Sequence, residues 1–161
     1  MLTRDQAVGL MHDYTTSDAL RKHMYAVEIA MRAMAERAGE DPEQWGLVGL
    51  LHDFDYERFP NDAHSPDAEH PSEGVRLLAA RGMPEPMRRA ILGHAGYTGV
   101  PRDTPMARSL FAVDELCGFL VARELVRPSR SLAAMAVSRV RKKLKDKESA
   151  RGVSQIGREK V

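Results

Sequence analysis

The spacing of apolar residues is the feature that most restricts what this chain can fold into. No segment alternates apolar and polar residues for long enough to indicate a strand, whereas apolar residues recur at three- and four-residue steps throughout. One such stripe, which we expect in the core, comprises Leu20, Met24, Val27, Met31 and Met34. The pattern predicts an all-α fold.

Helix start and stop signals divide the chain into about six to seven helices. Thr3 and Gln6 have the spacing of a capping box, Ser17 can cap a second helix, and Gly39 can supply its left-handed end. Asp41-Pro42 and Thr104-Pro105 each place a capping oxygen before a proline at the first helical position. Further helices are expected over residues 71–82, 84–93 and 132–147, with an irregular loop over 54–69.

Length and hydropathy indicate one globular domain. The chain has 161 residues, within the usual size range of a single domain. We expect a single-domain helical bundle over residues 1–150 and a frayed C-terminal tail over 151–161. No stretch approaches the roughly 20 apolar residues of a membrane span, and the N-terminus lacks an apolar signal core, so we expect a cytoplasmic protein with no membrane partner.

Charge is unevenly distributed along the sequence. The formal net charge is +1, but residues 121–161 hold 12 Lys/Arg against 4 Asp/Glu. This basic segment is interpreted either as a solvated helix face or as help in holding an anionic substrate. Because the net charge is near zero and basic residues do not interleave with aromatic ones, nucleic acid is not expected as the main partner.

Several ionisable residues occupy apolar helical segments, where an unpaired charge is costly. Asp114 lies within Phe-Ala-Val-Asp-Glu-Leu, and His52-Asp53 closes the apolar run Leu-Val-Gly-Leu-Leu. His23 lies on or beside the apolar stripe of the helix expected from Ser17. Taken alone, Asp114 is better explained as a capping or paired carboxylate than as a metal ligand, and His52-Asp53 is a weak signal. Together they form an ordered set of N and O donors, spread over different helices, that can converge on a metal ion.

This ordered set resembles the H…HD…D signature of the HD superfamily of metal-dependent phosphohydrolases. The matching segments are Arg-Lys-His ending at His23, Leu-Leu-His-Asp ending at Asp53, and Ala-Val-Asp ending at Asp114. The wider sequence is similar to a small stand-alone group of HDIG-domain hydrolases, on the segments Leu50–Glu57 and Leu125–Pro128 and the intervening His70 and His94. The resemblance implies an HD-type helical bundle and covers nearly the whole chain.

The resemblance also implies a ligand set. In such families the signature residues bind one metal, which corresponds here to His23, His52, Asp53 and Asp114. Binuclear members add two histidines between HD and D and share the HD aspartate, which implies a second ion at His70, His94 and Asp53. The alternative for these two histidines is a capping or surface role. One or two divalent ions are therefore expected, and the N and O donors suit Mn, Fe, Co, Ni, Zn or Mg.

Asp55 is a departure from the HDIG pattern. Positions 54 and 55 are Phe and Asp, where that motif has Ile and Gly. The extra carboxylate can orient a ligand, donate a proton, or cap the following turn. We interpret Asp53 and Asp55 as the catalytic carboxylates of the predicted site.

The predicted activity is hydrolysis of a small phosphate ester or nucleotide by metal-activated water. Lys22, Arg127 and Lys145 are the expected phosphate contacts, because basic side chains complement a dianionic substrate. Two alternatives stay open, a di-iron oxygenase with a similar ligand set and a non-catalytic nucleotide-sensing module. The sequence leaves the substrate and the oligomeric state open, a homo-oligomer included.

Overall fold

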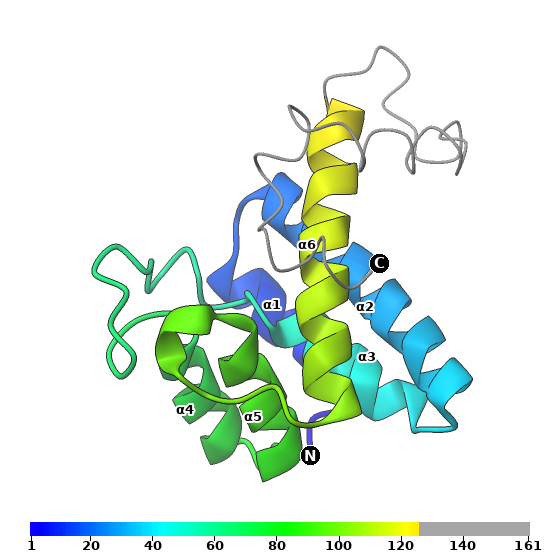
Figure 1. Cartoon of the computed structure of the whole chain (residues 1–161). Helices are drawn as coiled ribbons and strands as arrows, with labels where there is room; N and C mark the ends of the chain where they lie inside the picture. The colour runs from blue at the N-terminus through cyan, green and yellow to red at the C-terminus, as the bar shows by residue number, and fades with distance from the viewer. Residues whose placement is uncertain (126–161) are drawn as a thin grey trace. The chain divides into compact units, whose positions relative to one another are not determined.

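The computed structural model describes the backbone of residues 1–125 and the side chains of residues 1–118. Every regular element in that range is a helix: α1 (Arg4–Tyr14), α2 (Asp18–Ala38), α3 (Pro42–Leu51), α4 (Ser72–Ala80), α5 (Glu85–His94), the short 3₁₀ helix η1 (Gly96–Thr98) and α6 (Pro105–Leu125) (Figure 1). The all-α prediction is confirmed. The helix expected over residues 132–147, the tail over 151–161, Arg127 and Lys145 lie outside the described residues.

The first two helices begin where the sequence predicts. The Thr3 side chain accepts a hydrogen bond from the Gln6 amide while the Gln6 side chain accepts from the Thr3 amide, which completes the capping box of α1. Ser17 caps α2, and Gly39 ends it with φ of 71°, a conformation that favours glycine.

The next two starts show small departures. Asp41 caps α3 by accepting from the amide of Glu43. The Gln44 side chain donates to the Asp41 carboxylate, whereas in a capping box it would accept from the Asp41 amide. Helix α4 begins at Ser72, so Pro71 is its N-cap residue and not its first helical residue. The Thr104-Pro105 signal begins α6 as expected, because the Thr104 hydroxyl accepts a hydrogen bond from the Ala107 amide.

Close packing of α3 against α2 determines where the C-terminus of α3 lies. A Cβ atom at Gly49 would lie 2.8 Å from the Val27 carbonyl oxygen, and one at Gly46 would lie 2.7 Å from Nε of Arg32. Gly49 therefore lets the two backbones approach closely, whereas Gly46 makes room for the Arg32 side chain. The residues that follow α3 are thereby brought beside the N-terminal half of α2.

The core follows the predicted stripe of α2 except at its two ends, and at the first of them Leu20 is only half-buried. Met24, Val27 and Met31 are fully buried, whereas Met34 is 36% exposed, so its expected place in the core is wrong. Burial continues instead at Ala35, four residues after Met31. An α-helix has 3.6 residues per turn, so a step of three residues falls short of a full turn. Position 34, three residues after Met31, therefore lies at the edge of the buried face.

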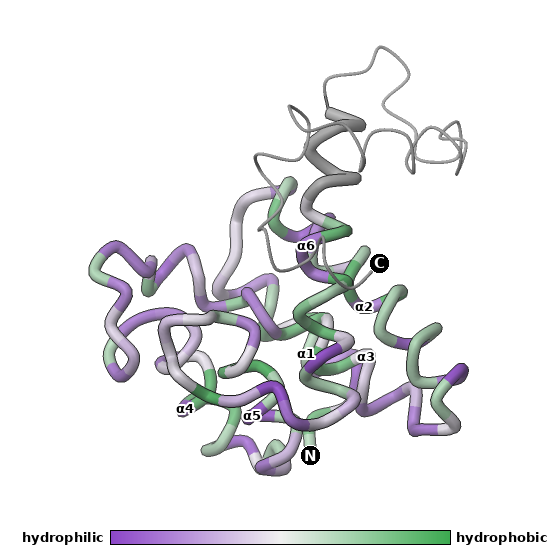
Figure 2. Tube along the Cα trace, in the orientation of Figure 1, coloured by the Kyte–Doolittle hydropathy of each residue, from purple (hydrophilic) through white to green (hydrophobic). Residues whose placement is uncertain are grey.

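Helices α4 and α5 lie side by side and are reached through the loop that follows α3 (Figure 1). This loop is predominantly hydrophilic (Figure 2). The chain divides into two compact units, Met1–Asp114 and Glu115–Val161, and the first contains all the residues of the site described below. Within residues 1–125, no helix combines the length and the apolarity that a membrane crossing requires.

Candidate metal centre

Four side chains from two helices and the end of a third form a first group of donors, here called cluster A: His23 on α2, His52 and Asp53 directly after α3, and Asp114 on α6. Nε2 of His23 lies 3.2 Å from Nε2 of His52 and 3.0 Å from Oδ1 of Asp114. Oδ2 of Asp53 lies 3.3 Å from Nε2 of His52 and 3.6 Å from Nε2 of His23. The four donors of the predicted H…HD…D set therefore face one point.

A second group, cluster B, consists of Asp53, His70 and His94. Its three donor atoms form a nearly equilateral triangle. Nε2 of His70 and Nε2 of His94 are 3.3 Å apart, and they lie 3.3 Å and 3.4 Å from Oδ1 of Asp53. Because Asp53 presents Oδ2 to cluster A and Oδ1 to cluster B, one carboxylate joins the two groups.

The donor spacing fits metal binding. Nitrogen and oxygen ligands lie about 2.0–2.2 Å from an ion such as Zn²⁺, so neighbouring ligands are about 3.0–3.5 Å apart. Most donor pairs in both clusters fall in this range. The geometry is therefore suited to one divalent ion in each cluster, without moving the helices that carry the donors.

Hydrogen bonds behind the imidazoles prepare three of them for a metal. Nδ1 of His52 donates to the carbonyl oxygen of Gly49 over 2.8 Å, and Nδ1 of His94 donates to that of Ile91. Nδ1 of His70 donates to Oδ1 of Asp55 over 2.7 Å. A carbonyl or an ionised carboxylate can only accept, so the proton of each neutral ring resides on Nδ1 and the lone pair on Nε2 points into the cluster.

Asp55 braces cluster B from behind and does not face the donors. Its side chain is 1% exposed, and its second oxygen accepts from the amide of Gly74 over 2.8 Å. Gly74 is the third residue of α4, so Asp55 satisfies an unpaired amide of that helix as well as orienting His70. Of the three roles considered for Asp55, this arrangement fits the orientation of His70, because the amide that Asp55 caps belongs to α4 and not to the following turn. The expected place of Asp55 among the catalytic carboxylates is not supported, since its carboxylate lies behind His70 and not at the donors.

Gly74 is a site residue that the sequence did not reveal. A Cβ atom at this position would lie 2.5 Å from Cγ of Asp55. No real Cβ contact is so short, so any other residue here would displace the carboxylate that holds His70. The sequence did hold a signal for this residue. Gly74 lies in the first turn of a helix, where no cap or positive φ requires glycine, which indicates a close contact with another segment.

Burial and charge act against each other in these residues. Burial lowers the pKa of His52, but the nearby charges of Asp53 and Asp114 raise it further, so the net pKa lies well above its usual value. Burial likewise raises the pKa of Asp114, and the charge of His52 with the hydrogen bond from His23 lowers it below its usual value. For His70, hydrogen bonds and charges of Asp53 and Asp55 outweigh burial and raise the pKa to about 9. The site thus favours positive charge beside its carboxylates.

Access to the donors is uneven. His52 and His70 are buried, whereas the side chains of Asp53 and Asp114 are 18% and 23% exposed. Cluster A is therefore the more open side of the centre.

Other residues predicted or considered lie away from these clusters. Lys22 is exposed on α2, directly before His23, and adjacent residues on a helix do not face the same direction. Nε2 of His12 lies 3.2 Å from the Tyr25 hydroxyl, and the His64 ring packs edge-on against Tyr97. Neither histidine belongs to a donor cluster in the described part of the chain, as the sequence indicated.

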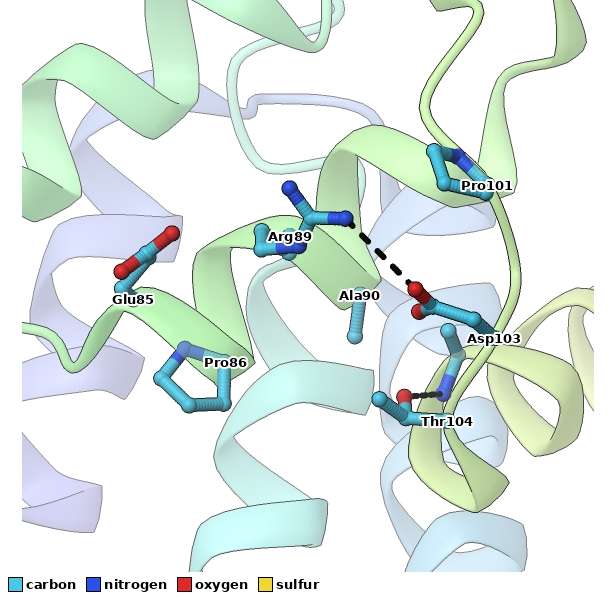
Figure 3. A pocket seen from close by; sticks show the side chains of 8 residues that line it. Glu85, Pro86, Arg89, Ala90, Pro101, Asp103 and Thr104 are labelled. Carbon is cyan, nitrogen blue, oxygen red and sulfur yellow. Dashed lines mark hydrogen bonds and ion pairs between the residues drawn. The ribbon is translucent and has the colours of Figure 1, made fainter.

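A pocket of about 230 Å³ lies elsewhere, at α5 and the start of α6 (Figure 3). Its cation, Arg89, points toward Asp103 across 3.8 Å, and both are largely exposed. Its lining contains none of the clustered donors: Glu85, Pro86, Arg89, Ala90, Pro101, Asp103, Thr104 and Ala107. Within the described part of the chain, this pocket is therefore separate from the two donor clusters.

Comparison with protein families agrees with the geometry. The family model described as "HD domain" matches residues 20–118, more than half of the chain. The chain belongs to the HD domain family. The match begins just before His23 and ends after Asp114, so it contains all six clustered donors of this HD-domain protein. Searches of curated proteins and of solved structures each found no match.

Proposed function

We propose that this HD-domain protein is a metal-dependent phosphohydrolase acting on a small phosphate ester or nucleotide. The observation that carries the proposal is the pair of donor clusters joined at Asp53, whose two carboxylate oxygens each lie 3.3–3.6 Å from two imidazole nitrogens. Two cations held on one carboxylate suit an anionic phosphate substrate. When bound, such ions lower the pKa of water and offset the charge on phosphoryl oxygens.

The residues of the chain have distinct roles in this proposal. Asp53 would hold both ions, because it contributes one carboxylate oxygen to each cluster. When their rings are neutral, His52, His70 and His94 would each present the lone pair of Nε2, because an acceptor retains the proton on Nδ1. Asp55 acts through His70, because its carboxylate contacts that ring and the α4 backbone and not the open side of the centre.

Phosphate contacts complete the proposal. Lys22 is an exposed cation next in sequence to His23, and a long flexible side chain can reach around the helix to an anion. Arg127 and Lys145 remain proposed contacts that lie outside the described residues. Neutralising Lys22 is expected to raise KM for a phosphate ester more than it lowers kcat.

Metal analysis with matched activity assays tests the proposal. Wild-type protein, His52→Ala and Asp114→Ala are analysed for bound elements and assayed with a generic phosphomonoester and a generic phosphodiester. We expect up to two ions per chain in the wild type, with hydrolysis of at least one ester. Both variants should lose metal and activity together, because each removes a donor of cluster A.

Other outcomes separate the remaining functions. Tightly bound iron with dioxygen consumption and no ester hydrolysis would identify an oxygenase. Nucleotide binding without turnover would identify a sensing module. Absence of bound metal in metal-replete protein would overturn both enzymatic functions.

A further inference from the structure

Tyr56 lies against the metal centre without belonging to it. Its amide donates to the carbonyl oxygen of Asp53 over 3.1 Å, so both residues share one tight turn. Its ring centroid lies 5.1 Å from that of His70, with the two planes 77° apart. Tyr56 therefore contacts one residue of cluster B and follows the carboxylate that joins the two clusters.

The ring of Tyr56 is also open to solvent. It is 40% exposed, whereas the rings of the other tyrosines are less so. Among the described residues, the other large apolar side chains with comparable exposure are aliphatic: Met1, Ile29, Met34 and Leu116. A single exposed apolar side chain is ordinary on a protein surface. Its position beside a metal donor is what distinguishes Tyr56.

Neighbouring aromatic rings are occupied by other contacts. The Tyr97 hydroxyl donates to the carbonyl oxygen of His70, and the His64 ring packs on the Tyr97 ring. The Arg58 guanidinium lies 4.0 Å above the Tyr14 ring. The Tyr56 ring meets the His70 ring edge-on, and because the residue is 40% exposed, part of its surface is available to a ligand.

We infer that Tyr56 forms an aromatic wall for the organic group of the substrate and favours phosphate esters that carry a planar ring. This inference rests on the proposed function, because it assumes that a phosphate is anchored at the clusters. The ester group of an anchored phosphate must extend beyond the buried donors, and Tyr56 provides an apolar surface within one side-chain length of them. Stacking of two aromatic rings would strengthen binding about 3- to 10-fold.

Equilibrium binding of two phosphonates tests the wall without requiring turnover. Phenylphosphonate and cyclohexylphosphonate each carry a six-carbon ring on a P–C bond that hydrolysis does not cleave, but only the phenyl ring is planar and aromatic. Calorimetric titration of the metal-loaded full chain should show that phenylphosphonate binds about 3- to 10-fold more tightly. Metal content is measured on every sample.

Three variants locate this preference. Tyr56→Phe should retain it, and Tyr56→Leu should abolish it while still covering His70. Tyr25→Leu makes the same change on α2, where the Tyr25 hydroxyl contacts His12, and should leave the preference intact. A role confined to covering His70 predicts that Tyr56→Leu, which still covers that ring, leaves the ratio of the two affinities unchanged.

The wild-type titration can overturn the inference even if a variant fails to fold. Equal affinity for the two phosphonates, or binding of neither, would exclude an aromatic wall. A preference that survives in Tyr56→Leu would exclude Tyr56 as its source. A Tyr56-dependent preference in a protein that hydrolyses no phosphate ester would uphold the wall and overturn the proposed function.

Discussion

Cluster A and cluster B share Asp53 but are built differently. Cluster A gathers four donors from helices far apart in sequence and is partly open to solvent. Cluster B has three donors, and both of its imidazoles are buried and held from behind by a hydrogen-bond acceptor. Fewer protein donors leave more coordination positions for water or substrate. We therefore expect cluster A to bind its ion more tightly and cluster B to depend more on its supporting residues.

Removing the shared carboxylate should have the largest effect. In Asp53→Ala both clusters lose a donor, so we expect loss of both ions and a fall in hydrolysis of more than about 100-fold, beyond the effect of removing a supporting residue. His23→Ala and His94→Ala, which each affect one cluster, should each lose one ion. Elemental analysis and titration with Mn²⁺ provide the measurement.

The two clusters do not bind metal independently if a single-cluster variant loses the same number of ions as Asp53→Ala. Loss of both ions in His94→Ala would show that the two clusters bind metal only as a unit. Retention of two ions in Asp53→Ala would show that its carboxylate does not hold them.

Loss of the support behind cluster B should have an intermediate effect. Asp55→Asn removes the charge that holds His70, and Gly74→Ala places a methyl group where the Asp55 carboxylate lies. Both should weaken binding of the second ion about 10- to 100-fold and leave the first ion bound. Asp62→Asn, an exposed acid in the same loop, is the matched control. Equal weakening of both ions would refute a role specific to cluster B.

The smallest effect is expected at Glu57, on the side of cluster A. Its carboxylate accepts from the Thr16 amide over 2.9 Å and from the Ser17 amide over 2.7 Å, which ties the turn after Asp53 to the start of α2. These backbone hydrogen bonds lower the pKa of Glu57. A lowered folded-state pKa stabilises the protein above the unfolded value of about 4.5, and this contribution is lost as the pH falls through the folded value.

Urea unfolding of the wild type and Glu57→Gln measures this contribution. Because Glu57 is exposed, we expect the variant to be less stable by under about 1 kcal/mol at neutral pH. The difference should shrink as the pH falls below about 4.5 and through the lower folded-state pKa of Glu57, because protonation removes the charge. A difference that does not change with pH would show that the charge is not responsible.

Local signals in the sequence account for most of the helix boundaries. Thr3, Ser17, Gly39 and Thr104 act as predicted, because a cap requires only contacts within a few residues. Pro71 shows the limit of such signals, since α4 begins one residue later than its proline suggests. Met34 shows another, because only the neighbouring helices decide where a buried stripe ends.

The sequence by itself identified the six donors, and the structure brings all six together; their role as ligands remains a prediction. Tertiary structure alone decided that the two oxygens of Asp53 face different clusters, that Asp55 lies behind His70, and that Gly74 makes room for it. The physical reason is that residue type limits which chemistry a side chain can perform, whereas orientation depends on contacts between segments that no local pattern encodes.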